Sequence, residues 1–229
     1  MTTSGTTTGT MTAQDVVQAA MEELGVLSAG ERAEGTELDV GIRTLNWMLK
    51  SFTARGVNKW RETSIIITVP AGQASVQLDP AVEDVLGARV RISTSYERMM
   101  FRYERGQYLQ LPNKQSPGYP VNYYVDRQRD AATLYLWPVP QQDTTLLLDI
   151  LRVIDDVTDP TQTIDVPSKW LETVYVALAA RMASVQGVTR TDPATAQALA
   201  VRAQAFEQIL LDDDRPASIY MGAYGERYF

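Results

Sequence analysis

The sequence predicts an α+β fold in which a four-helix bundle, made of two N-terminal and two C-terminal helices, carries an inserted antiparallel β lobe and extended termini. Apolar residues recur at helical spacing through residues 12–60 and 160–214, whereas residues 61–159 hold short β-branched runs divided by turn residues. The two ends, residues 1–11 and 215–229, lack both patterns. Because helical segments stand on each side of the β region, one bundle closed by both pairs is the simplest arrangement that buries their apolar faces.

The N-terminal part predicts a flexible arm followed by two helices. Residues 1–11 are Thr, Gly and Ser with Met at both ends, and such a segment buries too little surface to offset the entropy of ordering it. Thr12 and Asp15 have the spacing of a capping box, so a helix is expected to begin there and to end at Gly25. Apolar residues three and four positions apart predict a second, longer helix over residues 38–52.

The central part predicts a series of short strands. Its β-branched and aromatic runs are bounded by Pro, Gly and Asp, which are typical of turns. The expected strands cover residues 65–69, 76–78, 85–92, 99–102, 121–126, 134–137 and 145–153. Parallel strands need a crossover of a dozen or more residues, usually a helix, and no such segment is evident here. The expected pairing is therefore antiparallel, in a meander or a small sandwich.

Two further helices are expected in the C-terminal part. Pro167 and the serine after it suit a helix start, and the apolar stripe continues to Gly187. Asp192 and Pro193 then have the residue types of an N-cap and a first helical position. This last helix is expected to end in the acidic run at residues 212–214.

Composition excludes several classes of chemistry. The 229 residues include no cysteine and no histidine, so disulfides, thiolate nucleophiles, Cys/His zinc sites and Ser-His-Asp triads are ruled out. No glycine-rich phosphate loop is present, and we predict no catalytic residue, no metal site and no cofactor. The chain also lacks an apolar run long enough to cross a membrane and a basic, apolar leader, so no membrane contact is expected.

Charge is unevenly distributed along the chain. The formal net charge is −7, which argues against a protein that wraps a nucleic-acid backbone. However, residues 85–129 carry eight Lys or Arg and three Asp or Glu, whereas residues 143–214 carry five and twelve. The β lobe is therefore expected to be basic and the helical part acidic, which favours contact between opposite lobes of neighbouring copies.

Five arginines in the β lobe are candidates for an interface or a channel wall. They alternate with aromatic residues, as in surfaces that bind single-stranded nucleic acid. The same alternation on a strand also arises from one wet and one buried face. The candidates are Arg89, Arg91, Arg98, Arg102 and Arg105.

The C-terminal segment 215–229 is unusually aromatic for a chain end. Disordered tails are poor in aromatic residues, whereas tyrosine is a common anchor in protein interfaces. We therefore predict a docking tail, with folding back onto its own domain as the alternative. Its anchors are Tyr220, Tyr224, Tyr228 and Phe229.

Several phrases resemble one known family. They are residues 18–26 (QAAMEELGV), 45–50 (LNWMLK), 108–114 (YLQLPNK), 123–128 (YYVDRQ) and 134–140 (LYLWPVP), together with Asp155-Asp156 and the helix at 171–183. These phrases and the order of elements, over residues 11–214, are similar to head-to-tail adaptor, or connector, proteins of short-tailed phages. That group includes the tail tubular protein A and packaged-DNA stabilisation families.

The resemblance implies a structural role rather than turnover. Such proteins form a ring of twelve copies below the portal vertex, join the head to the tail tube or nozzle, retain packaged DNA and form part of the ejection channel. The implied partners are further copies of the chain, the portal protein, the tube or nozzle protein, tail fibres and, transiently, packaged DNA. The implied location is the neck or tail of the virion, after assembly in the host cytoplasm. The tail at 215–229 would dock on the portal or on a neighbouring copy.

Two other functions remain open from the sequence. A peptidoglycan hydrolase of the virion would use the carboxylates of Glu22, Glu23 or Asp39. A DNA-binding module would act through the basic β lobe, with a steep dependence of its affinity on salt.

Overall fold

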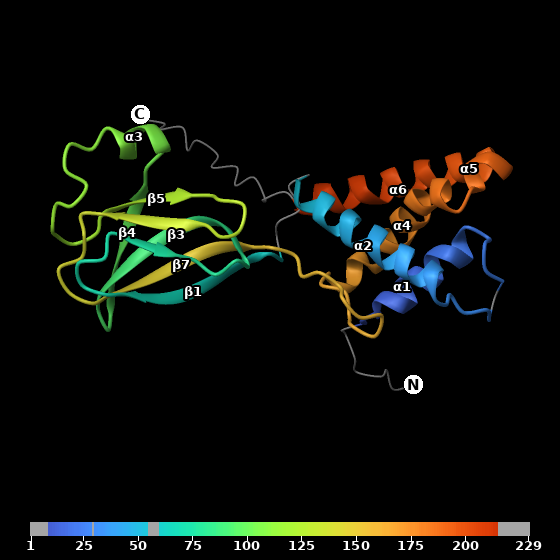
Figure 1. Ribbon diagram of the computed structural model, residues 1–229, viewed down its shortest axis with the longest axis horizontal. Helices are drawn as coiled ribbons and strands as arrows, with labels where there is room; N and C mark the ends of the chain where they lie inside the picture. The colour runs from blue at the N-terminus through green and yellow to red at the C-terminus, as the bar shows by residue number, and fades with distance from the viewer. Residues whose placement is uncertain (1–8, 29, 55–59, 215–229) are drawn as a thin grey trace, which may run out of the picture. The chain divides into compact units, whose positions relative to one another are not determined.

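The computed structural model describes residues 9–28, 30–54 and 60–214, and it divides into two compact units (Figure 1). Among the described residues, the helical unit comprises residues 9–28, 30–48, 158–163 and 168–214, and the sheet unit comprises residues 49–54, 60–157 and 164–167. The chain therefore leaves the helical unit, builds the sheet unit and returns.

Helices form in all four segments where the apolar spacing predicts them. The helices of the described residues are α1 (Ala13–Glu23), α2 (Thr36–Ala54), α3 (Arg105–Leu109), α4 (Leu171–Val185), α5 (Val188–Thr191) and α6 (Pro193–Asp214), with a 3₁₀ turn at Ser168–Trp170. The predicted capping box begins α1, because the Asp15 amide donates to Thr12 Oγ1 over 3.2 Å and the Thr12 amide donates to Asp15 Oδ2 over 3.0 Å. Asp192 likewise accepts the Thr195 amide at 3.1 Å and caps α6. Within these described ranges, no helix combines the length and hydropathy that a membrane crossing needs.

Helices α1 and α2 approach closely at a glycine. Gly41 lies in α2, and a Cβ atom at this position would stand 2.4 Å from Cγ1 of Val17 in α1. Val17 is fully buried and β-branched, so it has little freedom to move aside. The absence of a side chain at Gly41 therefore sets how near the two helices can lie. Helix α4 packs against α1 and also against α6.

Strands also form in all seven segments where they are predicted. They are β1 (Glu62–Val69), β2 (Ser75–Gln77), β3 (Val82–Ser93), β4 (Tyr96–Arg102), β5 (Asn122–Asp126), β6 (Thr133–Trp137) and β7 (Thr144–Arg152). They build one sheet in the order β1-β7-β3-β4-β5-β6-β2. All pairs are antiparallel except β4 and β5, which run parallel where Phe101 lies opposite Asn122.

The predicted fold class is wrong. The chain has a seven-stranded, curled, mixed sheet resembling a half-barrel and six helices within the described residues, not a four-helix bundle with a small antiparallel insertion. The parallel pair exists because residues 103–121, including α3, form a connection that returns the chain to the last residues of β4, where β5 begins beside Phe101 and runs in the same direction. Helices α3 and α5 are too short, at five and four residues, to produce a periodic apolar stripe.

The sheet unit has one apolar core, on the inner side of the curled sheet. Strands from both ends of the strand order contribute to it, which requires the sheet to bend until they face a common interior. The fully buried members are Val69, Val85, Val90, Leu134, Leu136, Leu146 and Leu148. The outer side of the sheet is left for other contacts.

Substitution Gly41→Ala is expected to destabilise the helical unit by about 2 kcal/mol, because its methyl group overlaps Val17 in a packed core. Thermal and urea unfolding measure the effect. Gly106→Ala in α3 is the control, since a Cβ there meets no atom within 4 Å. The added substitution Val17→Ala should recover part of the loss. Equal behaviour of the Gly41 and Gly106 variants would contradict the close approach.

Candidate assembly surface

The outer side of four adjacent strands, β1, β7, β3 and β4, is not covered by any described element. Successive side chains of a strand point to opposite sides of the sheet, so the residues next to the buried core residues point outward. We call this surface the open face. It consists of Ser64, Ile66, Arg89, Arg91, Glu97, Met99, Phe101, Leu147 and Asp149.

Ion pairs join β7, β3 and β4 of the open face, and one hydrogen bond joins β1 to them. Asp149 Oδ1 on β7 accepts the Ser64 hydroxyl of β1 over 2.7 Å and lies 3.1 Å from Arg89 Nη2 on β3. Glu97 on β4 pairs with Arg89 through Nη1 at 3.4 Å and with Arg91 through Nη2 at 3.0 Å. Two arginines thus meet two carboxylates, so the network carries no net charge. Partly exposed pairs of this kind contribute little stability each, and their main effect is to cancel the positive charge of β3.

Large apolar side chains lie in register with these charges. Ile66 is opposite Leu147, Leu147 is opposite Arg89, and Arg89 is opposite Met99. The exposed fractions of Ile66, Met99 and Phe101 are 60%, 72% and 71%. Exposed apolar side chains that gather on one face, beside polar groups, are typical of protein–protein contact surfaces.

Over β5 and β6, the outer side of the sheet is covered by α3. Tyr108 of α3 stacks on Tyr124 of β5 and contacts Tyr135 of β6, with ring centroids 5.2 Å apart in both cases. Burial raises the pKa of the Tyr108 hydroxyl, and the nearby Tyr135 adds to this rise. Figure 1 shows α3 at the edge of the sheet unit beside β5. A helix of the same chain therefore covers the outer side of β5 and β6, whereas no described helix covers the open face.

The five candidate arginines do not form one basic surface. Arg89 and Arg91 lie on the open face, but Arg98 and Arg102 share the side of β4 that buries Met100. Arg102 pairs with Asp84 through both guanidinium nitrogens at 3.0 and 3.3 Å, and Arg98 donates to the Pro120 carbonyl at 3.3 Å. The arginines are thus divided between two sides of the sheet.

Arg105, the fifth candidate, is exposed at the first position of α3. On β4, Met99 and Phe101 point outward and are exposed, whereas Arg98 and Arg102 lie on the side of Met100, Arg98 half-buried and Arg102 paired with Asp84.

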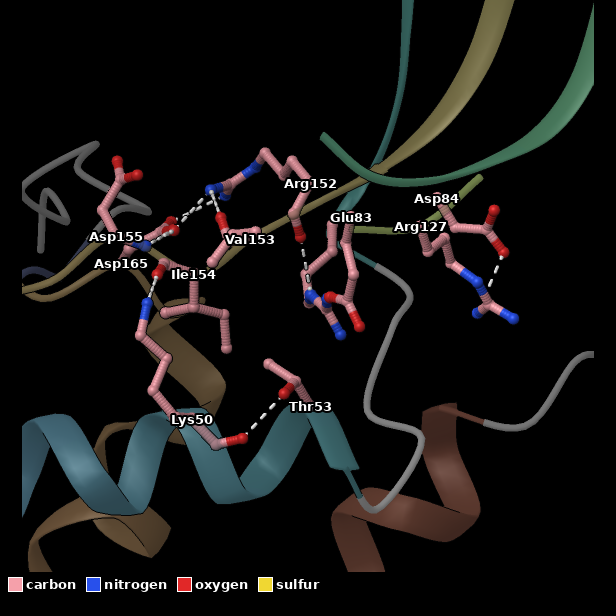
Figure 2. Close-up of polar contacts among 11 residues, drawn as sticks. Lys50, Thr53, Glu83, Asp84, Arg127, Arg152, Val153, Ile154, Asp155 and Asp165 are labelled. Carbon is pink, nitrogen blue, oxygen red and sulfur yellow. Dashed lines mark hydrogen bonds and ion pairs between the residues drawn. The ribbon is translucent and has the colours of Figure 1, made fainter. Parts of the chain in front are cut away.

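A second polar cluster anchors the strand ends where the chain enters and leaves the sheet (Figure 2). The buried Arg61 side chain pairs with Glu83 and donates its Nε to the Arg152 carbonyl over 2.8 Å. Arg152 in turn forms a two-pronged pair with Asp165, with Nη2 to Oδ1 at 2.7 Å. Lys50 Nζ, on the last turns of α2, donates to the Ile154 carbonyl over 2.5 Å. These contacts hold the ends of β1, β3 and β7 to the connecting segments.

Asp165 is stabilised as an anion within this cluster. Partial burial raises the pKa of its carboxyl, but hydrogen bonds from Arg152 and from the Asp155 amide, which lies 3.2 Å from Oδ2, outweigh burial and lower the pKa below its ordinary value. The cluster is therefore a structural anchor whose strength depends on pH.

Two of the carboxylates considered for a hydrolase are engaged by other side chains. Glu23 pairs with Arg202, and Glu22 accepts the Gln18 side-chain amide over 2.7 Å. No group of three or more potential metal ligands occurs in the part of the chain that the structure describes. The tail anchors Tyr220, Tyr224, Tyr228 and Phe229 lie outside the described residues.

The sequence predictions missed the apolar members of the open face. A signal was present in β1, where Ile65, Ile66 and Ile67 follow one another, because a strand with one wet face normally alternates apolar and polar residues. For Met99 and Phe101 the alternation with arginine does not say which side of the strand is exposed.

Comparison with known proteins gives one family. The family model of the SU10 adaptor protein matches residues 11–223. No curated protein sequence matches. Among solved structures, a chain titled "Neck of empty GTA particle computed with C6 symmetry" aligns over 78% of this chain and 84% of its own length, with 11% identity and a TM-score of 0.27, which is too low to support a conclusion.

Substitution Asp165→Asn is expected to lower the free energy of unfolding at neutral pH by about 2 kcal/mol, because Arg152 loses its charged partner. The folded-state pKa of Asp165 is lowered, so its contribution is complete above the ordinary value of 3.8 and is lost as the pH falls through the lower folded value. Urea midpoints measured across this range should converge for the two proteins at acid pH. The control is Asp130→Asn, whose side chain is 87% exposed, and a constant difference at all pH values would refute the linkage.

Glu97 and Asp149 are expected to weaken the binding of duplex DNA to the open face, because they neutralise its arginines. The double variant Glu97→Gln/Asp149→Asn leaves two arginines without acidic partners, so the slope of log affinity against log salt should steepen by about one to two units. Fluorescence anisotropy with a labelled duplex measures this slope. The variant Arg89→Gln/Arg91→Gln should change little from the wild type. A steep wild-type slope that this second variant abolishes would instead favour a DNA-binding module.

Proposed function

Because the chain belongs to the SU10 adaptor protein family, a family of phage head–tail adaptors, we propose that it forms a ring between the portal and the tail tube or nozzle. The coarse role is that of a structural adaptor in the phage neck. The observation that carries the proposal is the family match over residues 11–223, which includes both the helical and the sheet unit. The assignment to the tail tubular protein A group within short-tailed phages is the finer form of this proposal.

The surfaces of the sheet unit support assembly rather than turnover. The open face presents apolar side chains around a neutralised ion-pair network, as a protein partner requires. A ring of identical copies, for which twelve is the proposed number, needs two different complementary flanks on each copy. The proposed partners are neighbouring copies, the portal protein, the tube or nozzle protein and tail fibres.

Retention of packaged DNA and passage during ejection are part of the proposal. A channel wall should contact DNA weakly and without regard to sequence. The pairing of Arg89, Arg91 and Arg102 with carboxylates of the same unit suits weak contact, since few positive charges are left to neutralise phosphates. The protein would act in the virion after assembly in the host cytoplasm.

A hydrolase role has less support. It would require two carboxylates from among Glu22, Glu23 and Asp39 to act together. Glu23, however, is held by Arg202 through an ion pair. A nucleophile or acid engaged in this way is poorly placed for reaction with a glycosidic bond. We therefore propose that the chain is not an enzyme.

The aromatic segment 215–229 is proposed to dock on the portal. Truncation after Asp214 should weaken binding to the isolated portal protein at least tenfold, because four aromatic anchors are removed. Surface plasmon resonance measures the affinity, and negative-stain imaging of the mixture shows whether rings form. A full-length variant with serine at Tyr220, Tyr224, Tyr228 and Phe229 separates loss of anchors from loss of length. Unchanged binding of both variants would remove the tail from the proposal, and a full-length chain that stays monomeric with portal would refute the adaptor role.

A further inference from the structure

The outer side of helix α6 is uncharged from Ala194 to Ile209 and ends at the exposed Asp212, which accepts the Gln208 side-chain amide over 3.0 Å. Its inner side packs on α4 and α5 through buried residues that include Leu199, Ala203 and Leu210. The exposed residues between Ala194 and Ile209 recur at spacings of three and four, which places them on one side of the helix. They are Ala194, Gln197, Ala198, Val201, Gln204, Ala205, Gln208 and Ile209.

The lack of charge on this side is unusual for a surface helix. Charged residues make up 21% of the whole chain, yet none of these eight exposed positions carries one. The exposed fractions of Val201 and Ile209 are 60% and 63%. The two charged residues of this stretch, Arg202 and Glu207, are both half-buried, and Arg202 points away to Glu23 and Glu172 and lies over the Phe206 ring at 5.3 Å. The α6 outer side therefore has the chemistry of a surface that another protein covers.

The open face of the sheet has matching chemistry. Both surfaces expose large aliphatic or sulfur-containing side chains, and neither has an excess of charge, because the open face cancels its own. A strongly charged partner, such as a nucleic acid or an acidic protein, would gain little from either surface. The side-chain amides of Gln197 and Gln204 can accept and donate hydrogen bonds to the ion-pair network without introducing an unpaired charge.

We infer that the open face of one copy packs against the outer side of α6 of the next copy around the ring. This inference rests on the proposed function, since it identifies the two flanks that a ring requires. A contact between two different surfaces can repeat from copy to copy, and it forms a ring when the rotation between neighbours closes. A contact of one self-complementary surface with itself would stop at a dimer. The open face lies in the sheet unit and α6 in the helical unit, so each copy has one surface of each kind.

Site-directed crosslinking tests the contact, and the absence of native cysteine makes the result unambiguous. Proteins carrying Met99→Cys and Val201→Cys together, assembled on portal, should give a ladder of covalent multimers with a bifunctional maleimide reagent. Mixtures of the two single-cysteine proteins should stop at dimers. The matched control carries Gln128→Cys, at an exposed position of the sheet unit, together with Val201→Cys. This protein should give no ladder of multimers.

Charge substitution provides a second test. Met99→Glu should reduce ring formation on portal at least tenfold, because the contact would bury an unpaired carboxylate, and Val201→Lys should act in the same way. The combined Met99→Glu/Val201→Lys protein should form rings again, since each contact then contains a pair of opposite charges. Circular dichroism and urea unfolding of each monomer establish that the variants fold, and Gln128→Glu is the control.

The possible outcomes separate the two proposals. Rings that form without crosslinking between positions 99 and 201, and that tolerate Met99→Glu, overturn the inference and leave the adaptor role in place. Wild-type protein that forms no ring on portal contradicts the proposed function and this inference together. Crosslinking with restoration by the paired charges supports both.

Discussion

Seven strands share one apolar core because the sheet curls until its two ends face a common interior. This constraint leaves the outer side of the sheet without a second layer, since a single curled sheet buries only one face. The chain covers part of that side with α3, whose Tyr108 stacks on the rings of β5 and β6. The remaining part, over β1, β7, β3 and β4, has no cover from the described residues and carries the exposed Ile66, Met99 and Phe101. The open face is therefore a consequence of how the core is closed.

The same closure decides the electrostatics of the sheet unit. Residues 85–129 are rich in arginine, but the carboxylates that neutralise them include Asp84 and Asp149, which lie outside that stretch. Antiparallel pairing of β3 with β7 brings Asp149 beside Arg89, sixty residues away in the chain. A net charge counted along the sequence cannot include such partners. The surface that results is neutral and partly apolar, which is chemistry for a protein neighbour rather than for a phosphate backbone.

The sequence was informative wherever local physics dominates. The capping residues Thr12 and Asp192 mark the starts of α1 and α6, and the β-branched runs mark all seven strands. The sequence was misleading wherever the structure of a segment depends on residues far away in the chain. Nothing local to β4 shows that Phe101 points outward and that Arg98 and Arg102 point inward, because strand facing depends on which side of the sheet becomes the core. The short crossover through α3 was also invisible, since five residues give no helical period.

The sequence by itself determined the element types, the exclusion of thiol and imidazole chemistry, and a resemblance to phage adaptors that the family match over residues 11–223 supports. These depend on residue identity and short spacing, which are legible without coordinates. The tertiary structure alone decided that the β region is one curled, mixed sheet rather than a small antiparallel insertion. It also decided which arginines are neutralised and which apolar side chains remain exposed. Those properties arise from strand order and register, which join residues far apart in the chain and so leave no local trace in the sequence.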